Sequence, residues 1–230
     1  MHATSSLNEA RGLLDNAIRS RLWNKPIMEP VEKIRFPTGI FFMRERGGTG
    51  QDLAEQVKAS FAYWNKDSGQ YFDVVFPGWG NDGGQFCCFN FTAFTQCKNE
   101  FQNISKWRYS GETDILLLNY DYKITHWSRP QSFIGKGDFA LEEVILLPVE
   151  VMIRDGRVSS LDALMQELVN SAKLSASRSD KSVLWELRDR VAFERTRKAA
   201  WEGLKAMFLK DMSRVYNELR PFVMCDLRIE

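Results

Sequence analysis

Histidine and cysteine are scarce in this chain. The two histidines, His2 and His126, are far apart, and the four cysteines include no Cys-x-x-Cys pair. Zinc sites in proteins need several such ligands at short spacing, so the sequence predicts neither a metal site nor a cofactor. The cysteines are instead expected to be buried thiols in a reducing compartment.

Long apolar runs and an excess of one charge are also missing. No run approaches the ~20 apolar residues that a membrane-spanning helix needs, and the first 24 residues lack the apolar core of a signal peptide. We therefore expect a cytoplasmic protein with no membrane association. The formal net charge of +1 argues against nonspecific electrostatic binding to nucleic acid.

The composition is that of an ordinary globular protein. Hydrophobic residues make up 44% of the 230 residues, and charged residues 27%. This length suits one sizeable domain with a real core, or one domain with a helical extension.

Apolar spacing and turn residues predict strands that alternate with helices. Helices are expected at residues 6–22, 52–64, 93–107, 160–174 and 182–219, and strands at 40–43, 71–76 and 114–122, then a hairpin at 144–158 and a last strand at 222–229. Residues 123–141 are expected to be irregular. This order favours a three-layer α/β fold, with a mostly parallel sheet and helices on both faces. Residues 1–178 would form that domain with its N-terminal helix, and residues 179–230 a helical extension.

The most informative local pattern is the stretch 39–52. An apolar run leads into three closely spaced glycines, and a helical pattern follows that Thr49 or Asp52 could cap. Backbone N–H groups at a helix start favour an anion. The stretch lacks the Gly-Lys-Ser/Thr of a P-loop and the glycine spacing of a dinucleotide fingerprint. It therefore indicates either an anion or nucleotide site or a tight turn. The candidate ligand-binding residues are Arg44, Gly47, Gly48, Thr49 and Gly50.

Three loops are expected to meet if the predicted strands are neighbours. They are residues 44–50, 77–84 and 119–127, and in parallel sheets ligands bind beyond the carboxyl ends of the strands. Asp121 is the candidate catalytic carboxylate, as acid, base or ribose binder, with a turn aspartate as the alternative. The further candidate ligand-binding residues are Trp79, Asn81, Asp82, Asn119 and His126.

The predicted order of elements resembles Toll/interleukin-receptor-type domains and nucleoside deoxyribosyltransferase-like domains. The resemblance is one of layout, with no motif that matches residue by residue. It implies a nucleotide-binding protein that cleaves an N-glycosidic bond of NAD or a nucleotide, in the manner of bacterial antiviral defence proteins. The alternatives are a non-catalytic nucleotide sensor and a structural subunit of a complex.

The predicted C-terminal helix, residues 182–219, is too long for one sheet to cover, since ~20 helical residues already span ~30 Å. Its aromatic and methionine residues do not fit one narrow stripe. We therefore expect self-association or a protein partner along this helix.

Overall fold

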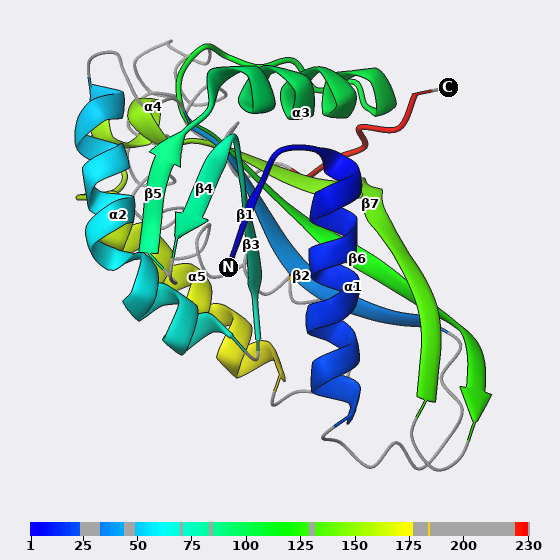
Figure 1. The fold of residues 1–230 in the computed structure, drawn as a ribbon. Helices are drawn as coiled ribbons and strands as arrows, with labels where there is room; N and C mark the ends of the chain where they lie inside the picture. Colours follow the sequence, from blue (N-terminus) through cyan, green and yellow to red (C-terminus); the bar gives the residue numbers. More distant parts are fainter. Residues whose placement is uncertain are drawn as a thin grey trace, which may run out of the picture.

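The computed structural model describes residues 1–23, 33–43, 49–69, 71–82, 85–128, 132–176, 184 and 224–229. Figure 1 shows the elements in the order β1 (His2–Thr4), α1 (Leu7–Trp23), β2 (Lys33–Phe42), α2 (Thr49–Ser68), β3 (Asp73–Pro77), β4 (Trp79–Asp82), β5 (Gln85–Phe89), α3 (Phe91–Ile104), β6 (Asp114–Ser128), β7 (Ser132–Pro148), α4 (Val149–Arg154), α5 (Leu161–Ala176) and β8 (Met224–Cys225).

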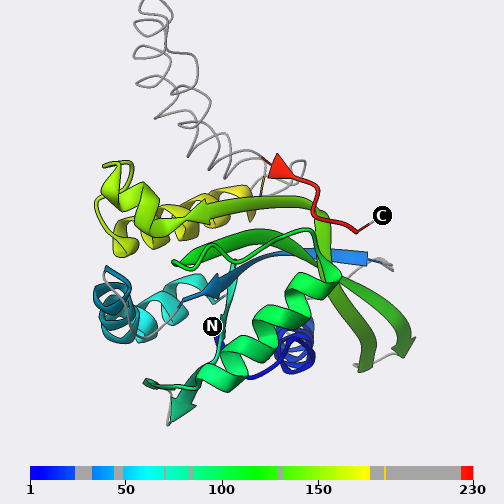
Figure 2. The ribbon, with the colours of Figure 1, turned by 90° about the horizontal axis from the view of Figure 1, so that it is seen from above.

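The large sheet has six strands in the order β1-β3-β2-β6-β7-β8. Strands β1, β3 and β2 pair in parallel, whereas β2 with β6, β6 with β7, and β7 with β8 pair antiparallel. The predicted α/β class is confirmed, with a mixed sheet whose parallel pairing ends at β2. Figures 1 and 2 both show the free end of the β6–β7 hairpin extending away from α2 and α5.

Helices cover both faces of the sheet, as predicted. Successive side chains of a strand point to opposite faces, and β2 shows the result. Ile40 and Phe42 join a buried cluster with the apolar residues of α1 and α3. Phe41 and Met43 join a second cluster with those of α2, α4 and α5. All four residues are fully buried, which is why this run is continuously apolar.

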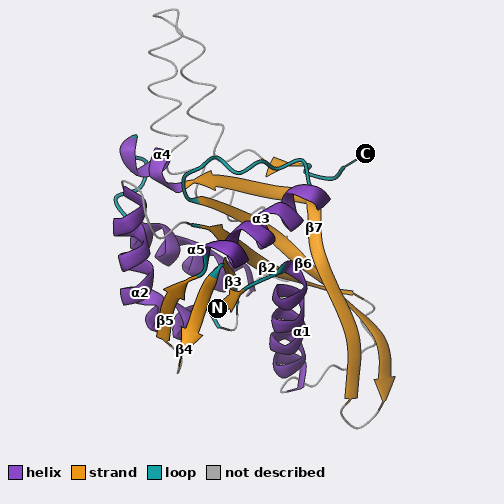
Figure 3. Ribbon diagram, turned by 45° about the horizontal axis from the view of Figure 1, so that its top comes forward, coloured by secondary structure: helices purple, strands orange, loops and turns teal. Residues whose placement is uncertain are grey.

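Three stretches differ from the prediction. Residues 79–82 of the expected glycine-rich loop 77–84 form one strand of a two-stranded antiparallel sheet, β4–β5, which Figure 3 shows beside α2. Residues 123–128 and 132–141 are not irregular but form the outer half of the β6–β7 hairpin. The expected hairpin at 144–158 is instead the end of β7 followed by α4, which begins directly after Pro148.

The turn at Gly78 joins β3 to the small sheet and to α3. Gly78 N–H donates to Thr4 O at 2.7 Å, and Asn90 N–H donates to Gly78 O at 2.6 Å. Gly78 has a φ of +79°, and a Cβ there would lie 2.5 to 2.9 Å from the Cβ, Cα and N of Phe94. Glycine is therefore required both by the backbone conformation and by the close approach of α3.

Buried polar contacts fix α1 against the sheet. Asp15 Oδ1 accepts hydrogen bonds from Tyr120 Oη at 2.8 Å and from Gly137 N–H at 2.9 Å. The Tyr120 ring lies over Gly137, where a Cβ would be 2.0 Å from a ring carbon. Near the end of α1, Arg21 binds Asp73 with both terminal nitrogens, at 2.5 and 2.8 Å. Bidentate pairs of this kind are strong and directional.

The predicted C-terminal helix lies outside the described residues, apart from Leu184, and its partner remains a prediction. Leu184 is buried in the core cluster with α2 and α5. The last described segment returns to the sheet, where β8 pairs with β7. Within the described part of the chain, no helix is long and apolar enough to span a membrane.

We predict that Gly78→Ala destabilises the fold by about 2–4 kcal/mol, because a left-handed φ and a clash with the α3 backbone act together. Gly111→Ala is the matched control. Gly111 also has a positive φ, of +95°, but a Cβ there meets nothing within 4 Å, so only about 1 kcal/mol of backbone strain is expected. Urea unfolding measures both, and equal losses would contradict the packing role of Gly78.

Candidate functional site

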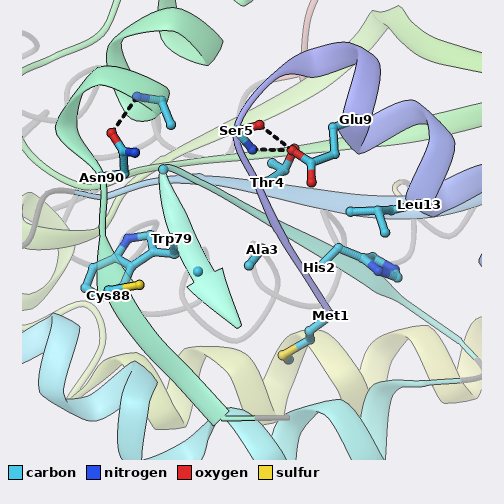
Figure 4. Close-up of a pocket in the computed structure, with 13 residues that line it drawn as sticks. Met1, His2, Ala3, Thr4, Ser5, Glu9, Leu13, Trp79, Cys88 and Asn90 are labelled. Atoms are coloured by element: carbon cyan, nitrogen blue, oxygen red, sulfur yellow. Dashed lines mark hydrogen bonds between the residues drawn. The ribbon is translucent and has the colours of Figure 1, made fainter. Parts of the chain in front are cut away.

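A cavity of about 470 Å³ opens at the edge of the sheet, next to β1. It runs along the edge strand β1 from Met1 to Ser5, between α1 and the β4–β5 sheet, and near Ser5 and Gly78 it reaches the carboxyl ends of β1 and β3 and the start of α3 (Figure 4). Ligands of α/β proteins commonly bind beyond such strand ends. The lining residues are Met1, His2, Ala3, Thr4, Ser5, Glu9, Leu13, Gly78, Trp79, Gly80, Cys88, Asn90 and Ala93.

The acidic group of the cavity is Glu9, in the first turn of α1. Its Oε2 accepts hydrogen bonds from Ser5 N–H at 2.7 Å and from Ser5 Oγ at 2.5 Å. Ser6 Oγ in turn accepts from Glu9 N–H at 3.2 Å. The bond to Ser6 is one half of a capping box, whereas the Glu9 carboxylate binds the residue before the cap, Ser5. Glu9 is exposed, and Figure 4 shows its second carboxylate oxygen pointing away from Ser5, so the bonds to Ser5 orient the carboxylate through one oxygen only.

The second helix start at the cavity belongs to α3. Asn90 is its N-cap, with an extended backbone, and Asn90 Oδ1 accepts from Ala93 N–H at 3.0 Å. The N–H groups of a first helical turn otherwise lack partners. Asn90 thus satisfies one of them and presents its amide nitrogen beside the cavity.

Trp79 forms the hydrophobic wall of the cavity and is itself buried. Its Nε1 donates to Met43 O at 3.3 Å, and its ring lies 5.2 Å from that of Phe89, centroid to centroid. The exposed thiol of Cys88 lies beside it (Figure 4). An aromatic wall with a few oriented polar groups is typical of small-molecule sites.

His2 connects the cavity to a buried ion pair. Its Nε2 lies 3.2 Å from Asp73 Oδ1, and Asp73 also holds Arg21. Burial opposes ionisation of Asp73, yet the hydrogen bonds from His2 and Arg21 outweigh it and lower the pKa of Asp73 to about 2. Asp73 is therefore a carboxylate at neutral pH and fixes the position of the His2 ring.

Asp121 does not lie with the glycine-rich turn. Strand β6 runs antiparallel to β2, so Asp114 pairs with Phe42 while Asp121 pairs with Arg35. Seven strand residues separate the two positions, about 23 Å. Asp121 forms ion pairs with Lys33 and, at 3.0 Å, with Arg35. The expected convergence is therefore wrong for residues 119–127, because it assumed that β6 runs parallel to β2.

The other predicted site residues are scattered. Trp79 lines the cavity. Asn119 is buried inside β6 rather than in a loop, between Pro37 and Ala140. His126 lies in the β6–β7 hairpin and pairs with Ile134. Thr49 and Gly50 open α2, and Asn81 and Asp82 lie in β4. Arg44, Gly47 and Gly48 lie outside the described residues, so their part in anion binding remains a prediction.

Sequence reasoning missed most of the cavity. Glu9, Asn90 and His2 were given no role, although Ser6-x-x-Glu9 is a recognisable capping pattern. That pattern predicts a helix start and says nothing of the chain that will face it. The parallel pairing of β1 with β3 brings His2 opposite Val75, and three residues are too few to show a strand by periodicity.

A second group of carboxylates is buried at the start of β6. Glu150 accepts from Thr113 N–H and from Thr113 Oγ1, both at 2.6 Å. Asp114 accepts from Ser110 N–H at 2.9 Å and from Ser110 Oγ at 2.8 Å. Burial, together with the negative charge of Glu150, raises the pKa of Asp114 to about 6 against these hydrogen bonds. These carboxylates hold the turn before β6 against the start of α4.

Comparison with protein-family models, curated proteins and solved structures gives no match to this chain. The geometry of the cavity is therefore the basis for inferring a function.

Asp114 should make stability depend on pH. Its pKa is about 6 in the folded protein, above its ordinary value of 3.8, so the stability that it contributes is complete below about pH 4 and is lost as the pH rises through about 6. Relative to Asp114→Asn, the wild type should lose up to about 3 kcal/mol of unfolding free energy between pH 4 and 7.

Urea unfolding across this pH range is the measurement. Ser110→Ala is the control, because it removes one hydrogen bond to the carboxylate but leaves the group that titrates, so the pH dependence should persist. Parallel profiles for the wild type and Asp114→Asn would show that Asp114 ionises as readily in the folded protein as in the unfolded chain.

Proposed function

We propose that the protein binds a polar, nucleoside-sized small molecule in the cavity beside β1. The observation that carries this proposal is the cavity itself, about 470 Å³, which runs along β1 and reaches the carboxyl ends of β1 and β3. Its size falls in the range of small-molecule sites, ~300–1,000 Å³. An aromatic wall and several oriented polar groups supply both contact area and hydrogen bonds.

The charges of the lining favour a particular kind of ligand. The thirteen described lining residues include one carboxylate, Glu9, and no lysine or arginine. Phosphate groups are usually bound by arginine, lysine or uncapped helix starts, and here Asn90 already caps α3. Hydroxyl and amino groups, by contrast, donate to a carboxylate. A nucleoside or similar uncharged molecule therefore suits the cavity better than a nucleotide.

Glu9 also supports a catalytic alternative. Enzymes that cleave glycosidic bonds commonly use a pair of carboxylates beside the sugar, and Glu9 supplies one carboxylate in the cavity. Asp121 is paired with two cations at the other end of β6, so Glu9 is the better candidate for that role. Release of free base from a nucleoside, followed by chromatography, separates an enzyme from a binding protein.

Thermal shift with adenosine, ribose, NAD and ATP tests the binding proposal. A ligand that binds only the folded protein stabilises it by mass action, by about 2.7 kcal/mol at a concentration 100 times its Kd. We expect the nucleoside to raise Tm more than the phosphate-bearing ligands do. No shift with any of the four, or a shift only with NAD and ATP, would contradict the proposal.

Glu9→Gln tests the contact itself. Loss of a hydrogen bond to a charged group removes about 1.5–3 kcal/mol, so affinity should fall roughly 10- to 100-fold. Glu112→Gln is the matched control, since its side chain is 44% exposed and pairs with Arg154 at 3.8 Å, outside the cavity lining. Equal affinities for the two variants would place the ligand elsewhere.

A further inference from the structure

Two adjacent cysteines of β5 lie in contact on one side of the β4–β5 sheet. The Sγ atoms of Cys87 and Cys88 are 3.1 Å apart. In a regular strand, neighbouring side chains point to opposite faces, so such a contact needs a local irregularity. The pairing register of the hairpin shifts between Trp79 and Asn81. This shift sets Gly80 opposite both cysteines, and bulges of this kind redirect side chains.

Gly80 provides the space for both sulfurs. A Cβ at this position would lie 2.8 Å from Cys88 Sγ and 3.3 Å from Cys87 Sγ. Both thiols therefore lie over the same glycine. The contact between the two sulfur atoms follows from the irregular pairing at Gly80.

The two thiols differ from the Cys97 thiol in their access to solvent. Cys88 is exposed and Cys87 is half-buried, whereas Cys97 is buried in α3. Burial raises the pKa of the Cys97 thiol to about 12, so Cys97 remains protonated. Reactivity in cysteines requires the thiolate and an accessible sulfur. Cys88 meets the second condition best, with Cys87 in position to react next.

We propose that Cys87 and Cys88 form a modification site that hydroperoxides oxidise to a disulfide between neighbouring residues. The Cys88 thiolate attacks a peroxide oxygen and the O–O bond breaks, which leaves a sulfenic acid on Cys88 and releases water or an alcohol. Cys87 then attacks that sulfur, the S–O bond breaks and a water leaves. Two electrons pass from the pair of thiols to the peroxide.

The geometry makes this step both accessible and reversible. Closing the bond brings the sulfurs from 3.1 Å to ~2.05 Å, a movement that side-chain rotation supplies. Neighbouring Cα atoms across a trans peptide are ~3.8 Å apart, below the ~4.4–6.8 Å that disulfides usually span. The closed pair is therefore strained, and strained, exposed disulfides are readily reduced.

Intact-mass spectrometry of the folded protein after treatment with hydrogen peroxide tests the proposal. The wild type should lose about 2 Da as one disulfide forms, and dithiothreitol should restore the original mass. Cys87→Ser and Cys88→Ser should each abolish the loss, while Cys97→Ser should retain it because Cys97 takes no part.

Four results would overturn the proposal. They are a loss of mass that survives in Cys88→Ser, a loss abolished by Cys97→Ser, a covalent dimer in place of the monomeric product, and a wild type that only gains oxygen or does not change. If a serine variant fails to fold, peptide mapping of the oxidised wild type decides, because the disulfide must join Cys87 to Cys88 and not involve Cys97 or Cys225.

Discussion

The pairing of β2 with two neighbours of different direction is the constraint on which the rest of the structure depends. Its middle pairs in parallel with β3 and its whole length pairs antiparallel with β6. The same strand contributes Ile40 and Phe42 to one core cluster and Phe41 to the other. Because direction changes there, the carboxyl ends of β1, β3 and β2 share an edge with the start of β6. The cavity and the buried Asp114 belong to that edge, and the tip of the β6–β7 hairpin to the opposite one.

The helices and strands that could be predicted from the sequence are those whose apolar residues recur with a regular spacing. Helices α1, α2, α3 and α5 carry apolar stripes that survive in the fold, and β6 begins with the expected apolar run. No sequence pattern indicated the direction of β6, because Ile115 to Leu118 would be buried on alternating faces whichever way the strand runs. The outer part of β7 could not be recognised as a strand from the sequence either. Gly135 and Gly137 look like loop residues in the sequence, but they are glycines because the rings of Tyr122 and Tyr120 lie against them.

The candidate site was less predictable than the fold. Of the candidate site residues that the structure describes, Trp79 alone lines the cavity. Glu9 and Asn90 carry ordinary capping patterns, and helix caps are common in all proteins. What distinguishes these two is that β1 pairs with β3, which sets the start of α1 beside the start of α3. A contact such as Leu7 N–H to Glu100, at 2.8 Å, joins residues 93 positions apart, and short-range patterns contain no information about it.

The position of α1 has a consequence for biosynthesis. Its buried carboxylate, Asp15, is satisfied by Gly137, 122 residues further along the chain. A ribosome adds ~5–20 residues per second, so α1 leaves it roughly 6–25 s before this partner. During that time Leu14 and Ile18 have no complete sheet to cover them, and closing so long a loop is slow. Until Gly137 is made, Asp15 lacks this partner, so the docking of α1 cannot be completed before most of the described sheet has been synthesised.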